Sequence, residues 1–140
     1  MRFVIVGGGP AGNTAATSAA RLGATVTMIE RDVVGGAAHL WDCIPSKTMI
    51  ATGGAMSFLR RSTGMGLEQA SPEVDTGALT ARIEDIKSHL QHGTSELLSS
   101  QGVRMVRGTA RFTGPNTVLV DGVDGSEEIA FDNALVATGS

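Results

Sequence analysis

Hydrophobic and polar positions in the first thirty residues predict a strand, a glycine turn, a helix and a second strand. Residues 2–6 are mostly apolar and β-branched, a pattern typical of a strand buried on both faces of a parallel sheet. Small, helix-favouring residues follow from 11 to 22, and Gly23 ends the helix. Residues 25–29 form a second apolar run that ends at Glu30. The chain is therefore predicted to begin with a βαβ unit.

The middle of the chain predicts two helices joined by a polar connection. Pro45, which is favourable in the first turn of a helix, starts a helix that continues to about Arg61. Residues 62–76 are polar and contain glycine and proline, so we expect a surface connection there. From Gly77 to about Ser100, apolar residues recur at helical spacing, which predicts a long amphipathic helix that needs a surface to pack on. This apolar stripe consists of Leu79, Ile83, Ile86, Leu90, Leu97 and Leu98.

The last forty residues are β-rich. Three runs separated by glycine-containing turns predict a three-stranded antiparallel meander. The runs cover residues 103–112, 117–121 and 128–131, with turns at 114–116 and 124–125. A short apolar strand over residues 134–137 follows and leads into Thr138 and Gly139. Together the elements predict an α/β fold with a central parallel sheet, an antiparallel meander and a long amphipathic helix.

Composition narrows the class of protein. The chain has 140 residues, enough for one domain with its own core but not for a second of ordinary size. A hydrophobic content of 41% and a net charge of −3 are typical of a soluble globular protein and give no basic surface for nucleic acid. No apolar run is long enough for a signal peptide or a membrane span, so we expect a cytoplasmic location.

A glycine-rich segment directly follows the first strand and opens the first helix. It reads Gly7-Gly8-Gly9-Pro10-Ala11-Gly12 and satisfies the pattern G-x-G-x-x-G. In this pattern the first glycine permits a tight turn, the second lets the backbone approach a pyrophosphate, and the third allows close helix packing. The helix N-terminus also offers free N–H groups to the anion. The candidate cofactor-binding residues of this segment are Gly7, Gly9, Pro10, Ala11 and Gly12.

A carboxylate strengthens this interpretation. Glu30 lies eighteen residues after Gly12, at the end of the second predicted strand. There it can accept hydrogen bonds from the hydroxyls of an adenosine ribose. With its neighbour Arg31 it completes a predicted Rossmann-like dinucleotide site. The alternative is a glycine-rich turn beside an unrelated surface glutamate.

Residues 35–47 carry the most specific chemical signal. They read Gly-Gly-Ala-Ala-His-Leu-Trp-Asp-Cys-Ile-Pro-Ser-Lys and resemble the active-site segment of the flavoprotein disulfide reductases, the class I pyridine nucleotide-disulfide oxidoreductases that include dihydrolipoamide dehydrogenase. In that family, two cysteines five positions apart follow Gly-Gly and precede Pro-Ser-Lys. Cys43 matches the second cysteine, whereas Ala38 occupies the position of the first. Because the chain has one cysteine, it cannot form the intramolecular disulfide.

The resemblance implies an FAD-binding domain over residues 1–140 and assigns further residues to the cofactor. It implies that Cys43 is the catalytic thiol nearest the flavin and that Lys47 lies beside the ring. A helix N-terminus and a nearby lysine are surroundings in which reactive cysteines occur. The alternatives are an inert buried cysteine and an ordinary surface lysine. The other cofactor-binding candidates are Gly35, Gly36, Ala110, Thr138 and Gly139.

The missing cysteine decides between possible activities. A dithiol–disulfide reductase needs one thiol to attack the substrate and a second to resolve the mixed disulfide. We therefore interpret the chain as part of an FAD-dependent oxidoreductase that passes electrons from NAD(P)H through the flavin to a quinone or another small acceptor. It resembles the NAD(P)H quinone reductase branch of the family, which lacks the same cysteine. The alternatives are a dihydrolipoamide dehydrogenase-type activity, a non-catalytic FAD-binding fragment, and an NAD-dependent dehydrogenase that uses the first motif for NAD.

The resemblance also implies what the chain lacks. It covers the N-terminal FAD-binding portion of the family, without the NAD(P)-binding and dimerisation domains. We expect NAD(P)H binding and a homodimer only for a full-length protein, and an inactive chain on its own. His39 and Trp41 either shape an acceptor pocket or fill space beside the flavin. His89 and His92 lie on the long helix without a set of further ligands, so we predict no metal site.

Overall fold

The computed structural model describes residues 1–68, 71–123 and 125–139. Four strands form a parallel sheet in the order β3-β2-β1-β7. They are β1 (Arg2–Val6), β2 (Thr25–Glu30), β3 (Arg104–Arg107) and β7 (Asn133–Val136). The helix α1 (Pro10–Arg21) connects β1 to β2. Val4 of β1 pairs with Thr27 of β2 and with Ala134 of β7. The predicted βαβ unit and the central parallel sheet are confirmed.

Three further strands form the antiparallel meander in the order β4-β5-β6. They are β4 (Thr109–Gly114), β5 (Thr117–Gly122) and β6 (Gly125–Ala130). The meander was predicted, although β6 begins earlier than expected. The expected turn at 124–125 includes Asp124, which lies outside the described residues.

One predicted strand is in fact two. The prediction of a single strand over residues 103–112 is wrong, because β3 belongs to the parallel sheet and β4 to the meander. The chain changes sheets at Gly108, whose N–H donates to the carbonyl of Glu30 at 3.0 Å. A Cβ at Gly108 would lie 2.7 Å from the carbonyl oxygen of Asp121. Only glycine therefore lets the two sheets approach each other so closely at this point.

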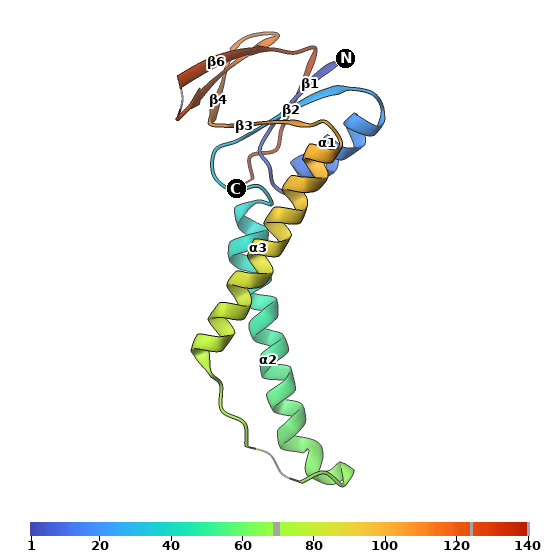
Figure 1. The fold of residues 1–140 in the computed structure, drawn as a ribbon, viewed down its shortest axis with the longest axis vertical. Coiled ribbons are helices and arrows are strands. Elements are labelled where there is room, and N and C mark those ends of the chain that lie inside the picture. Colours follow the sequence, from blue (N-terminus) through green and yellow to red (C-terminus); the bar gives the residue numbers. More distant parts are fainter. Residues whose placement is uncertain (69–70, 124, 140) are drawn as a thin grey trace.

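Two long helices extend away from the sheets side by side (Figure 1). They are α2 (Ile44–Arg61) and α3 (Thr76–Ser100). The connection between them contains a short 3₁₀ helix, η2 (Ser62–Met65), and its residues 69–70 lie outside the described part of the chain. Asp75 caps α3, because its side chain accepts a hydrogen bond from the Ala78 N–H at 2.9 Å.

The second predicted helix is confirmed, since α2 begins at Ile44 with Pro45 in its first turn and ends at Arg61. A π-helix, η1 (Ala38–Cys43), precedes α2 without a break. The N–H of Ile44 bonds to the carbonyl of His39, five residues back. A proline ring clashes with the carbonyl four residues before it in an α-helical turn. The wider π turn before Pro45 avoids that clash, which explains why the segment is helical but not α-helical.

The core has two parts, one on each face of the parallel sheet. The first joins the sheet to the meander and is formed by Val4, Ile29, Val118, Val120, Ile129 and Phe131. The second joins the sheet to α1 and the end of α3 and is formed by Ile5, Ala16, Val26, Met28, Leu98 and Val103. Neighbouring residues of β1 therefore point into opposite cores, as expected for a strand buried on both faces.

The apolar stripe of α3 packs on the sheet only at its C-terminal end. Leu98 is fully buried in the core, and Ile83 is buried farther along the helix. Leu90 and Leu97 keep 40% and 49% of their surface exposed. The predicted long helix is confirmed, but the sheet covers only the C-terminal end of its apolar stripe, because the helices extend beyond the sheet. Among the described residues, no helix is both long enough and apolar enough to cross a membrane.

Candidate dinucleotide-binding site

The glycine-rich turn after β1 has the geometry that its sequence predicts. Gly7 has φ +111°, and a Cβ on it would overlap the carbonyl of Ala137. A Cβ on Gly12 would overlap the carbonyl of Gly7. At Gly9, by contrast, the nearest atom to a Cβ would be 3.8 Å away. Two glycines thus make the turn possible, and the third leaves space above the N-terminus of α1 where an anion can approach.

No side chain caps the N-terminus of α1. Gly9 occupies the N-cap position with extended backbone and makes no side-chain cap hydrogen bond, and Pro10 begins the helix. Proline at this position has no N–H to leave unsatisfied. The remaining first-turn N–H groups and the positive end of the helix dipole are consequently available to a phosphate.

Glu30 is held at the end of β2 by backbone N–H groups. The N–H of Gly8 donates to Glu30 Oε2 at 2.6 Å, and the N–H of Asp32 donates to Oε1 at 2.7 Å. The residue is half-buried. An ionised carboxylate offers about four lone-pair positions, so both oxygens keep room to accept a hydroxyl from a ligand.

Two neighbouring cavities surround Glu30. The first has a volume of about 300 Å³ and lies between the glycine turn and the start of η1. The second has a volume of about 390 Å³ and extends to the start of β4. Both are lined by Gly7, Glu30, Arg31, Thr138 and Gly139. A ligand that occupies both cavities would therefore pass over the carboxyl ends of β1, β2 and β7, where α/β sheets bind nucleotides.

The structure brings most of the predicted site residues together. Besides the five shared residues, Gly9, Pro10, Ala11 and Gly36 line the first cavity and Ala110 lines the second. Gly12 is buried within the turn, below the cavity. Gly35 is buried too, and its N–H donates to the carbonyl of Gly8 at 2.8 Å. The Gly35-Gly36 pair therefore packs directly against the glycine turn.

Besides Gly12 and Gly35, two further predicted residues do not line these cavities. Cys43 and Lys47 are exposed and lie where η1 passes into α2. Cys43 precedes α2 as expected, but the helical run begins five residues earlier at Ala38. Trp41 is exposed and His39 is half-buried in the same segment.

Several lining residues were not among the predicted site residues. Asp32, Val33, Ala37 and Ala137 line the first cavity. Gly8 contributes a donor to Glu30 although its position in the fingerprint is a variable one. Their only signal was proximity to the strand ends, since the loops after β1, β2 and β7 meet at one edge of the sheet.

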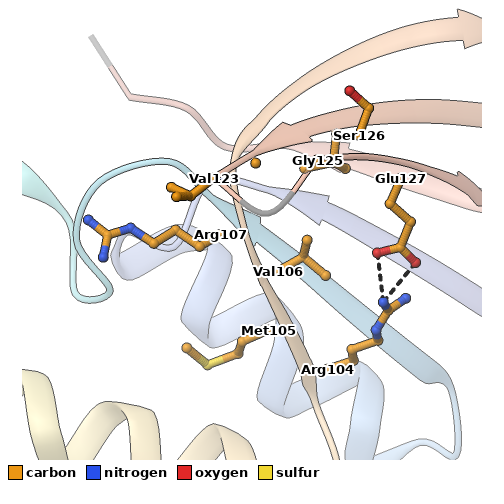
Figure 2. Close-up of a pocket in the computed structure, with 10 residues that line it drawn as sticks. Arg104, Met105, Val106, Arg107, Val123, Gly125, Ser126 and Glu127 are labelled. Carbon is orange, nitrogen blue, oxygen red and sulfur yellow. Dashed lines mark hydrogen bonds and ion pairs between the residues drawn. The ribbon is translucent and has the colours of Figure 1, made fainter.

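A third cavity, of about 340 Å³, lies away from this site between β3 and the β5–β6 hairpin (Figure 2). Arg104 and Glu127 face each other at one end, where Arg104 Nη2 donates to both carboxylate oxygens at 2.7 Å. Both side chains are about half exposed, so the pair contributes little to stability. No predicted site residue lines this cavity.

Histidine and carboxylate side chains form only pairs on α3. His89 Nδ1 lies 3.2 Å from Asp85, and His92 Nε2 lies 3.3 Å from Glu96. Within residues 1–68, 71–123 and 125–139, no three His, Cys, Asp or Glu side chains come together as a metal site would require.

Comparisons with known proteins agree with this geometry. Residues 1–140 match the family model described as pyridine nucleotide-disulphide oxidoreductase. The chain is 38% identical, over 142 residues, to "Dihydrolipoyl dehydrogenase 2" of Haloarcula marismortui, covering 99% of this chain and 30% of that protein. It is 32% identical, also over 142 residues, to "Dihydrolipoyl dehydrogenase" of Bacillus subtilis, covering 100% of this chain and 31% of that protein.

A solved structure is similar over the same region. The crystal structure of LpdA from Mycobacterium tuberculosis superimposes with a TM-score of 0.88 at 35% sequence identity. The match covers 99% of this chain and 32% of that chain. The chain thus spans about a third of the length of the proteins to which it is similar.

Proposed function

The chain belongs to the pyridine nucleotide-disulphide oxidoreductase family, and from this we propose that it forms the FAD-binding domain of an NAD(P)H-dependent flavoprotein oxidoreductase. Residues 1–140 would be one domain of that protein. The NAD(P)H site and the domain that forms most of a homodimer interface would lie in the two thirds of its relatives' length that this chain does not span.

The residues at the carboxyl edge of the sheet fit FAD. The open space above Gly9 and the uncapped start of α1 suit a pyrophosphate. Glu30 accepts hydrogen bonds and suits a ribose diol. The second cavity, which reaches Ala110, suits the adenine. The first cavity reaches Ala38, so the flavin would lie toward η1 with Lys47 nearby.

We further propose that this flavoprotein works without a redox-active disulfide. The observation that carries this proposal is Ala38, which lines the first cavity in a chain whose only cysteine is Cys43. When bound, FAD accepts a hydride and passes electrons to a second substrate. The chain's own residues would bind and orient it, and the methyl group of Ala38 would offer no nucleophile to a disulfide substrate. A quinone-like small molecule is then the proposed acceptor.

A second candidate is dihydrolipoyl dehydrogenase activity. The names of the similar proteins from Haloarcula and Bacillus favour it. The cysteine count opposes it, because reduction of a substrate disulfide through a protein dithiol needs two thiols. A third possibility, a non-catalytic FAD-binding module, has no observation of its own in its favour.

Acceptor assays distinguish these candidates. The protein, purified from its source, is assayed with NADH or NADPH and either a soluble quinone or oxidised lipoamide. We expect quinone reduction and no lipoamide reduction above background. Lipoamide turnover equal to quinone turnover would establish the second candidate. Bound flavin that neither nicotinamide reduces would establish a binding module, and the absence of a flavin absorbance band would exclude FAD.

The Cys43→Ala variant tests the role of the remaining thiol. Because the proposed electron route runs through the ring, we expect the variant to keep FAD and to be reduced by NAD(P)H. Loss of flavin reduction while FAD stays bound would contradict a route through the ring alone. Lys87→Ala, which removes a partly buried lysine of α3 that lines neither cavity, is the control.

The intact mass of the native polypeptide bears on the same question. A mass near three times that of this chain would match the length of its relatives and leave room for a nicotinamide site. A mass equal to that of the chain would favour the binding module, because the sequence contains a single G-x-G-x-x-G segment for dinucleotides.

A further inference from the structure

We propose that the backbone N–H groups of Gly8 and Asp32 act as a clamp that positions the Glu30 carboxylate for a ribose diol. In this view the clamp, and not the charge of Glu30 alone, sets the preference for a ligand with both ribose hydroxyls free. The inference rests on the proposed function, since it takes the adenosine ribose of FAD to bind at Glu30.

The clamp uses one donor for each carboxylate oxygen. The Gly8 N–H lies 2.6 Å from Oε2 and the Asp32 N–H lies 2.7 Å from Oε1. The Asp32 distance is at the short end of the range for charge-assisted hydrogen bonds, and the Gly8 distance is just below that range. The donors come from different segments, the turn after β1 and the loop after β2, so they fix the rotation of the carboxylate plane. The remaining lone pairs of both oxygens can then accept from two adjacent hydroxyls.

The Gly8 donor is itself held in place. Its backbone lies against the whole Glu30 side chain, because a Cβ at Gly8 would be 3.2 Å from Oε2 and 3.3 Å from the Cβ and Cγ of Glu30. On its other side, the carbonyl of Gly8 accepts the N–H of Gly35 at 2.8 Å. The carbonyl of Glu30 in turn accepts the N–H of Gly108 at 3.0 Å. Three chain segments, the turn after β1, the loop after β2 and Gly108, therefore determine where the carboxylate lies.

Backbone amides, and not cations, stabilise this charge. The five ion pairs of the described residues do not include Glu30, so no described Lys, Arg or His nitrogen lies within 4.0 Å of its oxygens. A bidentate arginine would occupy both oxygens and compete with a ligand. Two single amide donors leave the carboxylate open to neutral hydroxyl groups.

Asp32 allows the clamp to be tested by a matched pair of variants. Asp32→Pro removes the backbone N–H, whereas Asp32→Ala keeps the N–H and removes only the side chain. The Kd of each protein is measured for FAD and for an FAD analogue with 2′-deoxyadenosine. We expect wild type and Asp32→Ala to prefer FAD about tenfold, as for loss of one hydrogen bond to a charged group. In Asp32→Pro this ratio should fall toward one.

The ratio of the two Kd values separates a loss of positioning from a general structural defect. If Asp32→Pro binds both ligands more weakly but keeps the tenfold ratio, the proposed clamp is contradicted and the proposed function is not affected. If wild type binds neither ligand, the proposed function fails, and with it the ribose role assigned to the clamp. Far-ultraviolet circular dichroism of each variant checks that it is folded.

A second measurement does not depend on proline being accepted at position 32. The amide proton resonances of wild type and Glu30→Gln are compared by NMR without ligand. Because a charged acceptor is lost, we expect the Gly8 and Asp32 amides to move upfield by more than that of Gly53, which lies on α2 with no atom near its Cβ position. If either amide moves no more than Gly53, the clamp is not formed.

Discussion

At the scale of single residues, the proposed chemistry rests on position 38. Ala38 begins η1, and Cys43 ends it five residues later. In this π turn, backbone hydrogen bonds join residues five apart, as the bond from the Ile44 N–H to the His39 carbonyl shows. Side chains at positions 38 and 43 therefore lie one turn apart along the helix.

The Ala38→Cys variant tests that arrangement. We expect two titratable thiols after reduction and none after mild oxidation, because a disulfide needs its Cα atoms about 4.4–6.8 Å apart, a spacing that one helical turn provides. Quinone reduction should not increase, while lipoamide reduction should become measurable. A variant that keeps both thiols free under oxidising conditions would contradict the proposed spacing. A cysteine introduced at Ala55 on α2 serves as the control that should not pair.

A second residue-scale prediction concerns the glycine turn. Gly7→Ala places a side chain where φ is +111° and where its Cβ would overlap the Ala137 carbonyl. We expect loss of FAD binding and a fall in the free energy of unfolding of about 1–3 kcal/mol or more. The matched control is Gly53→Ala, in an open position of α2, which should gain about 0.5–1 kcal/mol from helix propensity. Thermal unfolding measures both effects. A lower midpoint temperature for Gly7→Ala and a higher one for Gly53→Ala would agree with this account, whereas equal shifts would contradict it.

At the scale of elements, Arg2 at the start of β1 and Asp132 just before β7 join the two ends of the chain. Asp132 accepts the Arg2 N–H at 2.7 Å and the guanidinium Nη2 at 2.9 Å. The Asp132 N–H donates back to the Arg2 carbonyl at 3.0 Å. These contacts lie where the paired strands β1 and β7 begin, so they connect the N-terminus of the chain to β7.

This contact predicts a dependence of stability on acid. The backbone hydrogen bond from Arg2, and then its side chain, lower the pKa of Asp132 below its ordinary value. A carboxyl group whose pKa is lower in the folded state stabilises that state at pH values above its unfolded pKa. This contribution is lost as the pH falls through the folded pKa. Asp132→Asn should therefore be less stable than wild type at pH 7 but equal to it in strong acid.

Urea unfolding at a series of pH values measures this difference. Glu84→Gln, at an exposed carboxylate paired with Lys87 on α3, is the control and should show a smaller loss at pH 7. A constant difference between Asp132→Asn and wild type from neutral to strongly acidic pH would show that ionisation of Asp132 does not contribute.

At the scale of the whole molecule, the chain separates into two parts with different surfaces. The sheets, α1 and the C-terminal end of α3 form the core, whereas α2 and the rest of α3 extend from it (Figure 1). Large apolar side chains remain exposed on α2, including Ile50 at 73% and Phe58 at 51%. Such side chains on an extended helical pair are typical of a protein–protein interface. We expect a second copy of the protein to cover them, in line with the homodimer proposed above.

Substitution of Ile50 tests this expectation. Ile50→Asp should leave the unfolding midpoint of dilute protein nearly unchanged, since surface substitutions usually change stability by less than about 0.5 kcal/mol. It should raise the dimer dissociation constant, measured by analytical ultracentrifugation, by about tenfold or more if the side chain is buried between copies. Met65→Asp, beyond the end of α2 in η2, is the comparison. A wild-type protein that stays monomeric at all concentrations would end the proposal of a homodimer through this surface.

The sequence by itself determined most elements of this protein and identified candidate site residues. The alternation of apolar residues and the small residues after Gly12 were enough for β1, α1 and β2, because these depend on neighbours along the chain. The glycine turn and Glu30 were recognisable because a dinucleotide needs the same backbone approach and the same acceptor in any βαβ unit. The missing thiol at position 38 needs no structure at all.

Only the tertiary structure decided how distant segments meet. The run through Gly108 is equally β-rich on both sides, so contact with Glu30 and Asp121, and not local pattern, divides it between two sheets. The exposure of Leu90 depends on where the sheet ends beneath α3. The Asp32 N–H became a candidate positioning group only when its distance to Glu30 was known. The periodicity of apolar residues predicts which face of a helix or strand is apolar. What packs against that face depends on the fold of the whole chain.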